Sequence, residues 1–171
     1  HLFTTVGKEC EGYAPDGTIF GSVSGVLVRD IPAVIKKHYT APASVMSIPD
    51  YAARNYTLMR LALQHRDVTL WATANPSTIL ELLRTLDEYK EEMIKDIELG
   101  TICDDFDIPF EIRDELDAYI CPRPKRAKEL RRIVEEKGKL EPKDFWPWLQ
   151  YLSTWKCGNT KIYMDKYMDQ F

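Results

Sequence analysis

The stretch Val68–Ile79, VTLWATANPSTI, decides the fold class. Its first half is rich in β-branched and aromatic side chains, which favour a buried strand over residues 68–74. Asn75 is a good N-cap residue, and Pro76 suits the first helical turn because that position needs no backbone N–H. We therefore predict a strand that passes directly into a helix. Such a helix directs unpaired N–H groups and a positive dipole end toward the strand tip, where α/β proteins bind ligands.

The helix that follows is predicted to run from Pro76 to Leu99. Its apolar residues recur at helical spacing, and Gly100 stands where a helix commonly ends in the left-handed conformation. The apolar stripe consists of Ile79, Leu82, Leu83, Leu86, Met93 and Ile97.

A second strand is predicted over Leu152–Cys157, followed by a last helix over Asn159–Phe171. The chain between the two strands is too long for a hairpin and contains helical patterns, so we predict parallel strands joined by crossover helices. Parallel strands place both strand-to-helix junctions on the same edge of the sheet, where a pocket can form. The predicted fold class is α/β, helix-rich, with a few mostly parallel strands.

We expect one partial domain over residues 1–171, with a β-rich irregular segment (1–48) and an α/β segment (49–171). In the first segment we predict a turn at Ala14–Gly17, a tight β bend at Phe20–Gly25, a short helix at Ile31–His38 and a strand at Ala41–Ser47. In the second we predict helices from Pro49 to about His65, over Glu111–Ile120 and over Pro124–Lys137, and a turn or short helix at residues 141–149.

The bulk composition excludes several classes of protein. The formal net charge of −4 argues against a general nucleic-acid binder. No apolar run approaches ~18 residues and no targeting segment is evident, so we expect a cytoplasmic protein without a membrane partner. The four cysteines are widely spaced, which is typical of free thiols in a reducing compartment. The three histidines lie in separate segments, and we expect no metal site.

No spacing of residues indicates a catalytic motif, since HExxH, GxSxG and a Walker loop are all absent from the sequence. Phe20–Gly25 is rich in glycine and serine but lacks the lysine of a phosphate loop, so a β bend is favoured. The basic run Arg123–Arg132 contains apolar residues at helical spacing, which favours a solvated helix face over a nucleic-acid patch. Three tryptophans are expected in the core or in a pocket wall: Trp146, Trp148 and Trp155.

An ordered set of stretches carries a family resemblance. They are Leu61–Val68 (LALQHRDV), Trp71–Ile79 (WATANPSTI), Leu86–Gly100 (LDEYKEEMIKDIELG), and Phe145–Leu149 (FWPWL) followed by Trp155–Gly158 and Tyr163. Together they resemble the auxin-responsive-promoter family, the plant acyl-acid amido synthetases that act on indole-acetate and jasmonate, with their bacterial relatives. The resemblance covers residues 45–171 and, more weakly, residues 17–25.

The resemblance implies an interior fragment of the large N-terminal domain of an adenylate-forming ligase. Family members use ATP and Mg²⁺ to convert a carboxylic acid to an acyl-adenylate, and then transfer the acyl group to an amine or amino acid. The resemblance places the phosphate loop before His1 and the Tyr-Gly-Ser/Thr-Glu motif after Phe171, so the fragment alone is not expected to catalyse or to hold a cofactor. The alternative is a non-enzymatic helical protein-interaction module. Open sheet edges predict that the fragment self-associates.

The resemblance also implies two sites but no catalytic residue within the fragment. The acyl-acid pocket would be walled by Thr73, Ala74 and Asn75, and the adenine would lie against the turn formed by Cys157, Gly158 and Asn159. Plant members have a large aromatic residue where this chain has Asn75, so a bulky, flat hormone is not expected as the acid. On periodicity alone Asn75 is a helix cap and Gly158 a turn residue, and these interpretations stay open.

Overall fold

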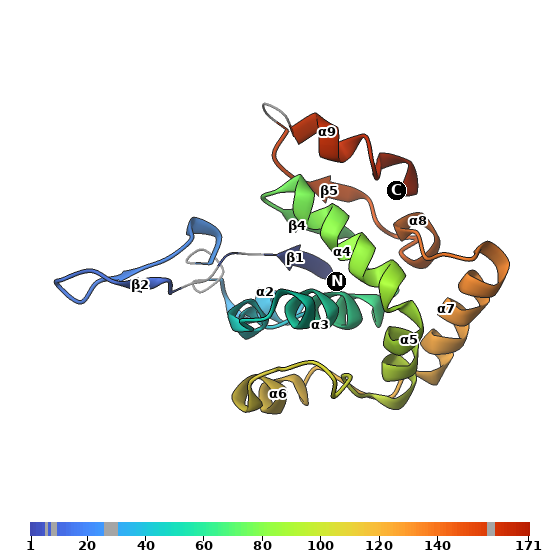
Figure 1. Cartoon of the computed structure of the whole chain (residues 1–171), viewed down its shortest axis with the longest axis horizontal. Coiled ribbons are helices and arrows are strands. Elements are labelled where there is room, and N and C mark those ends of the chain that lie inside the picture. The colour runs from blue at the N-terminus through green and yellow to red at the C-terminus, as the bar shows by residue number, and fades with distance from the viewer. Residues whose placement is uncertain (6, 8–9, 26–30, 157–159) are drawn as a thin grey trace.

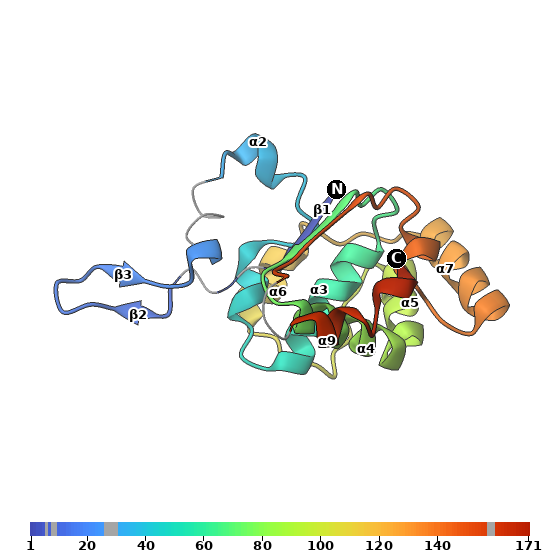
Figure 2. The same cartoon turned by 90° about the horizontal axis from the view of Figure 1, so that it is seen from above.

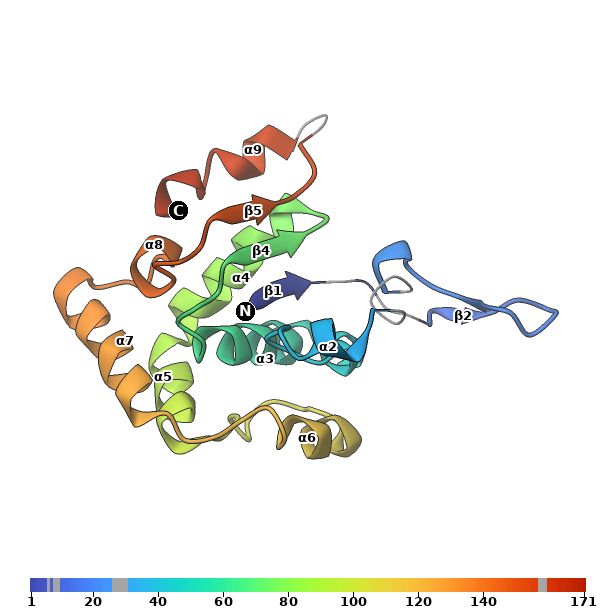
Figure 3. The ribbon, with the colours of Figure 1, turned by 180° about the vertical axis from the view of Figure 1, so that it is seen from behind.

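A parallel sheet forms the centre of the computed structural model, which describes residues 1–5, 7, 10–25, 31–156 and 160–171. The sheet has the strand order β1-β4-β5, as Figure 3 shows from behind. In the parallel register Phe3 lies opposite Trp71, and Trp71 lies opposite Leu152. The predicted α/β class and the parallel pairing of the two predicted strands are confirmed. The strands are β1 (Leu2–Thr5), β4 (Leu70–Thr73) and β5 (Tyr151–Ser153).

Helices α3 (Tyr51–Leu63) and α4 (Pro76–Glu88) cover one face of the sheet (Figure 2). The core beneath them contains the fully buried Phe3 and Trp71 rings, whose centroids are 5.1 Å apart. Trp146 closes this cluster, with its ring centroid 5.6 Å from that of Trp71. In Figure 3 none of the described helices lies over the opposite face of the strands, so the sheet is covered from one side.

The remaining elements surround this layer, and the β2–β3 hairpin projects away from the rest of the molecule (Figures 1 and 2). None of the helices in the described part of the chain combines the length and the apolar character that crossing a bilayer needs. The elements are β2 (Gly12–Tyr13), β3 (Ile19–Phe20), α2 (Ala33–Lys36), the 3₁₀ helix η1 (Ala43–Ser47), α5 (Lys90–Leu99), α6 (Phe110–Leu116), α7 (Pro124–Lys137), α8 (Pro142–Phe145), α9 (Lys161–Met164) and the 3₁₀ helix η3 (Met168–Gln170).

The hairpin forms around the predicted Pro-Asp-Gly turn. Gly17 has φ +85°, a conformation that glycine adopts without a steric penalty. The Asp16 carboxylate accepts a hydrogen bond of 3.0 Å from the Thr18 backbone N–H. The turn prediction is therefore confirmed.

Two predictions in the N-terminal part are wrong. Ala43–Ser47 forms the 3₁₀ helix η1 and not a strand, because Pro42 lacks a ladder donor and its carbonyl accepts from the Val45 N–H at 3.3 Å. Within Phe20–Gly25, residues 23–25 lie in a helical turn and not in a β bend. The Ser22 hydroxyl accepts from the Gly25 N–H at 3.0 Å, a local bond that favours the turn.

The predicted single helix over Pro76–Leu99 is also wrong, since it divides at Tyr89 into α4 and α5. Tyr89 has φ −114° and ψ 23°, outside the helical region. Its ring packs near the rings of Tyr56 and Phe106, at centroid distances of 5.8 and 5.4 Å. The Lys90 ammonium donates to the Asp87 carbonyl at 2.7 Å, which satisfies a carbonyl close to the break.

Near the C-terminus the predicted elements are shorter than expected. The strand expected over Leu152–Cys157 is observed as Tyr151–Ser153, and residues 157–159 lie outside the described part of the chain. The helix expected over Asn159–Phe171 divides into α9 and η3 among the described residues. Tyr167 stands between the two, and its fully buried side chain anchors the chain to the core where φ is −137°.

A buried polar network fastens the end of α5 to α3. The Asp96 carboxylate accepts hydrogen bonds from the Tyr56 hydroxyl at 2.6 Å, the Thr101 hydroxyl at 2.7 Å and the Cys103 N–H at 2.7 Å. The fully buried Arg60 guanidinium donates to the Asp96 carbonyl at 3.0 Å and the Thr101 carbonyl at 2.9 Å. Asp96, the aspartate of the Asp-Ile-x-x-Gly motif, therefore holds the C-terminal end of α5 in place.

Candidate functional site

The carboxyl ends of the three parallel strands lie on one edge of the sheet, at Thr5, Thr73 and Ser153. A cavity of about 330 Å³, which we call the strand-tip cavity, opens at this edge. Its wall is built from the end of β1, the β4 tip and the first turns of α3 and α4. This placement agrees with the expectation that the strand-to-helix junction of β4 borders a pocket.

The three residues predicted at the β4 tip all line this cavity. Thr73 is buried, whereas Ala74 and Asn75 are exposed. The Asn75 side-chain oxygen accepts from the Ser77 N–H at 3.1 Å, so Asn75 is the N-cap of α4. Asn75 therefore caps the helix and borders the cavity at the same time, and its role toward a substrate stays a prediction.

Arg54 is a lining residue that the sequence analysis missed. It lies in the first turns of α3, with its guanidinium carbon 4.0 Å from the centroid of the Tyr51 ring. Glu81 also lines the cavity, but it pairs with Arg84 at 2.8 Å. No carboxylate among the described residues pairs with Arg54, so an unpaired cation faces the strand-tip cavity.

A second cavity of about 270 Å³ adjoins the first over the tips of β4 and β5. The chain beyond β5 is held at this edge because the Ala74 carbonyl accepts from the Trp155 N–H at 3.1 Å and from the Thr154 hydroxyl at 3.4 Å. Trp155 lines this second cavity and is 67% exposed. The predicted nucleotide-binding residues Cys157, Gly158 and Asn159 follow directly, but they lie outside the described residues, so their role stays a prediction.

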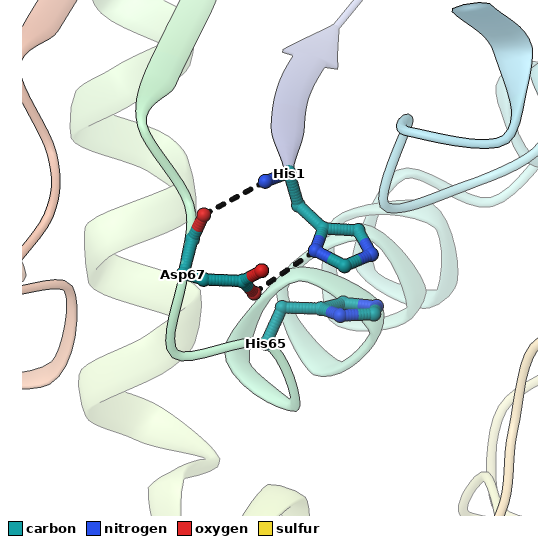
Figure 4. Close-up of side chains that lie close together, drawn as sticks. All are labelled: His1, His65 and Asp67. Carbon is teal, nitrogen blue, oxygen red and sulfur yellow. Dashed lines mark hydrogen bonds and ion pairs between the residues drawn. The ribbon is translucent and has the colours of Figure 1, made fainter.

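At the opposite end of the sheet, His1, His65 and Asp67 lie within reach of one another, although their sequence positions gave no indication of it (Figure 4). Their nearest ligand atoms are within 4.8 Å, and the two imidazole rings stack with centroids 3.8 Å apart. The Asp67 carboxylate lies 2.9 Å from His1 Nδ1.

Hydrogen bonding around His65 does not favour a metal ion at this place. Gln64 accepts from Arg60 through Oε1 at 2.7 Å and donates through Nε2 to the Tyr119 carbonyl at 3.0 Å. The amide nitrogen of Gln64 therefore faces His65 Nε2, at 3.3 Å, and the neutral ring keeps its proton on Nδ1. Burial, followed by the charge of Arg123, lowers the pKa of His65 to about 4. A positive neighbourhood opposes a bound cation, and the expected absence of a metal stays a prediction.

Comparison with solved structures shows what the fold is similar to. The chain is similar to a structure of the GH3.15 acyl acid amido synthetase, with a TM-score of 0.72 and 16% identity, covering 96% of this chain and 29% of that one. It is also similar to a structure of the AtGH3.15 acyl acid amido synthetase in complex with 2,4-DB, with a TM-score of 0.79 and 16% identity. That match covers 97% of this chain and 29% of the solved chain.

The sequence comparisons give the family. A search of curated protein sequences finds no match. The family model described as the GH3 family N-terminal domain matches residues 2–171. This match confirms the resemblance to acyl-acid amido synthetases that the ordered stretches carry. The chain belongs to the GH3 family, as the match of its residues 2–171 to the model of that family's N-terminal domain shows.

Proposed function

We propose that this chain forms the acid-binding wall of a cytoplasmic, ATP-dependent acyl-acid amido synthetase. The longer enzyme would adenylate a carboxylic acid and transfer the acyl group to an amine or amino acid. The family membership and the two solved structures named as acyl acid amido synthetases support this proposal. Because the chain spans 29% of the length of those structures, the activity is proposed for the longer protein, and the fragment alone is not expected to catalyse.

The unpaired Arg54 in the strand-tip cavity is the observation that carries the proposal. A guanidinium binds a carboxylate through two parallel hydrogen bonds, and the N-terminus of α4 adds a favourable dipole at the same cavity. Met46 and Leu58 supply apolar wall for the rest of the acid. A cavity of about 330 Å³ is at the small end of ligand pockets, which favours a compact acid.

ATP would supply the adenylyl group and Mg²⁺ would neutralise phosphate charge. Of this chain, Cys157, Gly158 and Asn159 are proposed to lie against the adenine, next to the second cavity. Glu81 is the one carboxylate that the described residues contribute to the two cavities, and it is paired with Arg84. The described lining therefore does not itself make a magnesium site, and we propose that the Mg²⁺ ligands lie elsewhere in the enzyme.

The direct test is ATP–pyrophosphate exchange by the full-length protein with a panel of aryl and aliphatic acids, and with this chain as a control. We expect acid-dependent exchange by the full-length protein and none by the chain alone. A full-length protein that binds ATP but exchanges with no acid would contradict the proposed chemistry. A full-length protein that does not bind ATP would favour the non-enzymatic interaction module.

Arg54→Gln tests the proposed carboxylate contact in the same assay. Loss of a charge-assisted hydrogen bond should raise the KM for the acid by roughly 10- to 100-fold, with a smaller effect on the KM for ATP. Arg132→Gln is the matched control, because Arg132 lies on α7 with its side chain 73% exposed. Equal KM values for the acid in both variants would remove Arg54 from the acid site.

A further inference from the structure

A third cavity, of about 560 Å³, lies at the end of the sheet opposite the strand-tip cavity. It borders the starts of β1 and β4 and the N-terminus of α7, so we call it the strand-base cavity. Its lining is cationic although the whole chain has a formal net charge of −4. The charged lining, apart from His1 and His65, comprises the cations Arg66, Arg123, Lys125 and Arg126 and the carboxylates Asp67 and Glu129.

Both carboxylates of this cavity are already paired. Glu129 lies 2.8 Å from Arg66 and 2.8 Å from Arg126. The Asp67 carboxylate bonds to the His1 ring, and the Asp67 carbonyl accepts from the His1 backbone nitrogen at 2.7 Å (Figure 4). The lining therefore contains no spare carboxylate for a further cation.

Arg126 is also fully engaged, contrary to the prediction of a solvated basic face. It is buried, and its guanidinium donates to the Leu63 carbonyl at 3.0 Å and the Phe145 carbonyl at 2.7 Å. Arg126 thus joins α7 to the end of α3 and to α8.

Arg123 and Lys125 differ from these residues because no described acceptor engages their side chains. The Nε of Arg123 is buried without a hydrogen-bond partner. A buried donor without an acceptor costs stability, more so when it is charged. Arg123 occupies the N-cap position of α7, a helix of 14 residues, and makes no side-chain cap bond there. Arg123 is only partly buried and lines the cavity, so its unengaged guanidinium is available to an acceptor that enters there.

We propose that the strand-base cavity binds a phosphate-type oxyanion, held by the guanidinium of Arg123 and the ammonium of Lys125. A guanidinium matches two oxygens of a phosphate, a lysine adds a point charge, and the positive dipole end of α7 favours an anion at the same place. Trp148 also lines the cavity and is 56% exposed. The site is independent of the proposed acid pocket, because it lies at the other end of the strands.

His65 provides an internal reporter of occupancy. It lines the cavity, and burial, followed by the charges of Arg123 and Arg126, opposes its protonation, whereas Asp67 favours it. An oxyanion beside Arg123 adds negative charge near the ring, so binding should raise the pKa of His65.

The test is a titration of the 171-residue chain with inorganic phosphate at constant ionic strength, with chloride as the reference anion. Imidazole resonances of His65, followed by NMR from pH 3 to pH 7, report binding and the pKa. We expect saturable binding that Arg123→Gln weakens roughly 10- to 100-fold, and that Lys125→Gln, at an exposed position, weakens less. Arg132→Gln on the same helix should bind phosphate as the unmodified chain does.

The variants also distinguish a specific phosphate site from nonspecific attraction of anions to a basic surface. Equal phosphate affinity in Arg123→Gln and Arg132→Gln would overturn the proposal, as would a chain that binds phosphate no better than chloride. If Arg123→Gln does not fold, the phosphate affinity of Lys125→Gln decides whether the site exists. A weakened affinity with an unchanged far-UV spectrum supports the site, and an unchanged affinity rejects it.

Discussion

Asn75 combines two tasks in one side chain, since it caps α4 and borders the strand-tip cavity. Asn75→Ala should therefore lower the free energy of unfolding by about 1 kcal/mol, because the Ser77 N–H loses its acceptor. Asn75→Asp keeps an acceptor at the same place and should restore most of that stability. Urea unfolding of both variants measures the effect. Equal stability of Asn75→Ala and the unmodified chain would show that the cap bond contributes nothing.

His65 gives the fold a dependence on pH. Its folded pKa of about 4 lies below the ordinary value of 6.5, so the unfolded chain takes up a proton first as the pH falls. Stability should therefore decrease between pH 7 and pH 5, by roughly 1–2 kcal/mol when partial solvent exposure is taken into account. Bound phosphate at the strand-base cavity would reduce this loss.

His65→Gln should flatten the stability curve in this window, measured by urea unfolding at a series of pH values. His38→Gln, at an exposed position, serves as the control and should keep the slope of the unmodified chain. Glu98, Glu129 and Glu141 have pKa values lowered by basic partners, so their contribution is lost at lower pH, below about 4.5. An unchanged slope in His65→Gln would contradict this assignment.

At the scale of elements, two helix ends offer a matched pair of glycines. Gly100 ends α5 with φ +72° and Gly138 ends α7 with φ +75°. A Cβ on Gly100 would lie 2.5 Å from the Pro122 nitrogen, whereas a Cβ on Gly138 would meet nothing within 4 Å. The two positions therefore share the backbone strain but differ in the steric clash.

Gly138→Ala should cost about 1 kcal/mol, from the left-handed conformation alone. Gly100→Ala should cost at least about 3 kcal/mol, because the Cys121–Pro122 backbone must also move. Chemical denaturation with unchanged m-values measures both. Similar losses of stability in the two variants would mean that the backbone around Pro122 moves at little energetic cost.

Elements with strong local signals were predictable from the sequence. The bounds of α7 follow from Pro124 at its start and Gly138 after its end, and the start of α4 follows from Asn75 and Pro76. The break at Tyr89 was not predictable, because no proline or glycine marks it and the rings it contacts come from α3 and from the loop after α5. Contacts between distant segments decide such positions.

The candidate site also has a part that was predictable from the sequence and a part that was not. The β4 tip was predictable because a strand, a cap and a helix follow one another in a single stretch. Arg54 was not, because its approach to the cavity depends on how the first turns of α3 and α4 pack together. The strand-base cavity brings together His1, His65 and Arg123, which are distant in sequence, so periodicity alone gave no indication of it.

At the scale of the whole molecule, the edges of the sheet predict self-association. Residues beside β1 partly cover its outer edge, where the Leu2 N–H donates to the His38 carbonyl at 2.8 Å and the Thr40 N–H donates to the Leu2 carbonyl at 3.1 Å. No described strand pairs with the outer edge of β5, and Tyr151 on that strand is 66% exposed. Open edges of this kind pair with other chains.

Sedimentation velocity over a range of concentrations should show dimers or larger species of this chain. Tyr151→Lys should reduce association, because a charge at an edge strand opposes pairing. Tyr13→Lys is the control for the hairpin, where Tyr13 is 68% exposed. A strictly monomeric chain at high concentration would contradict the prediction. If Tyr13→Lys reduces association more than Tyr151→Lys does, the β2–β3 hairpin and not the edge of β5 makes the contact.

The placement of the four tryptophans has a spectroscopic consequence. Trp71 and Trp146 are buried in the core, so their fluorescence reports folding. Trp155 lines the cavity at the strand tips and Trp148 lines the cavity at the strand bases, and both are more than half exposed. Replacing one exposed tryptophan at a time by phenylalanine leaves an emission signal that responds to a ligand at a single end of the sheet. The chain thus carries a separate natural fluorophore for each of its two proposed binding regions.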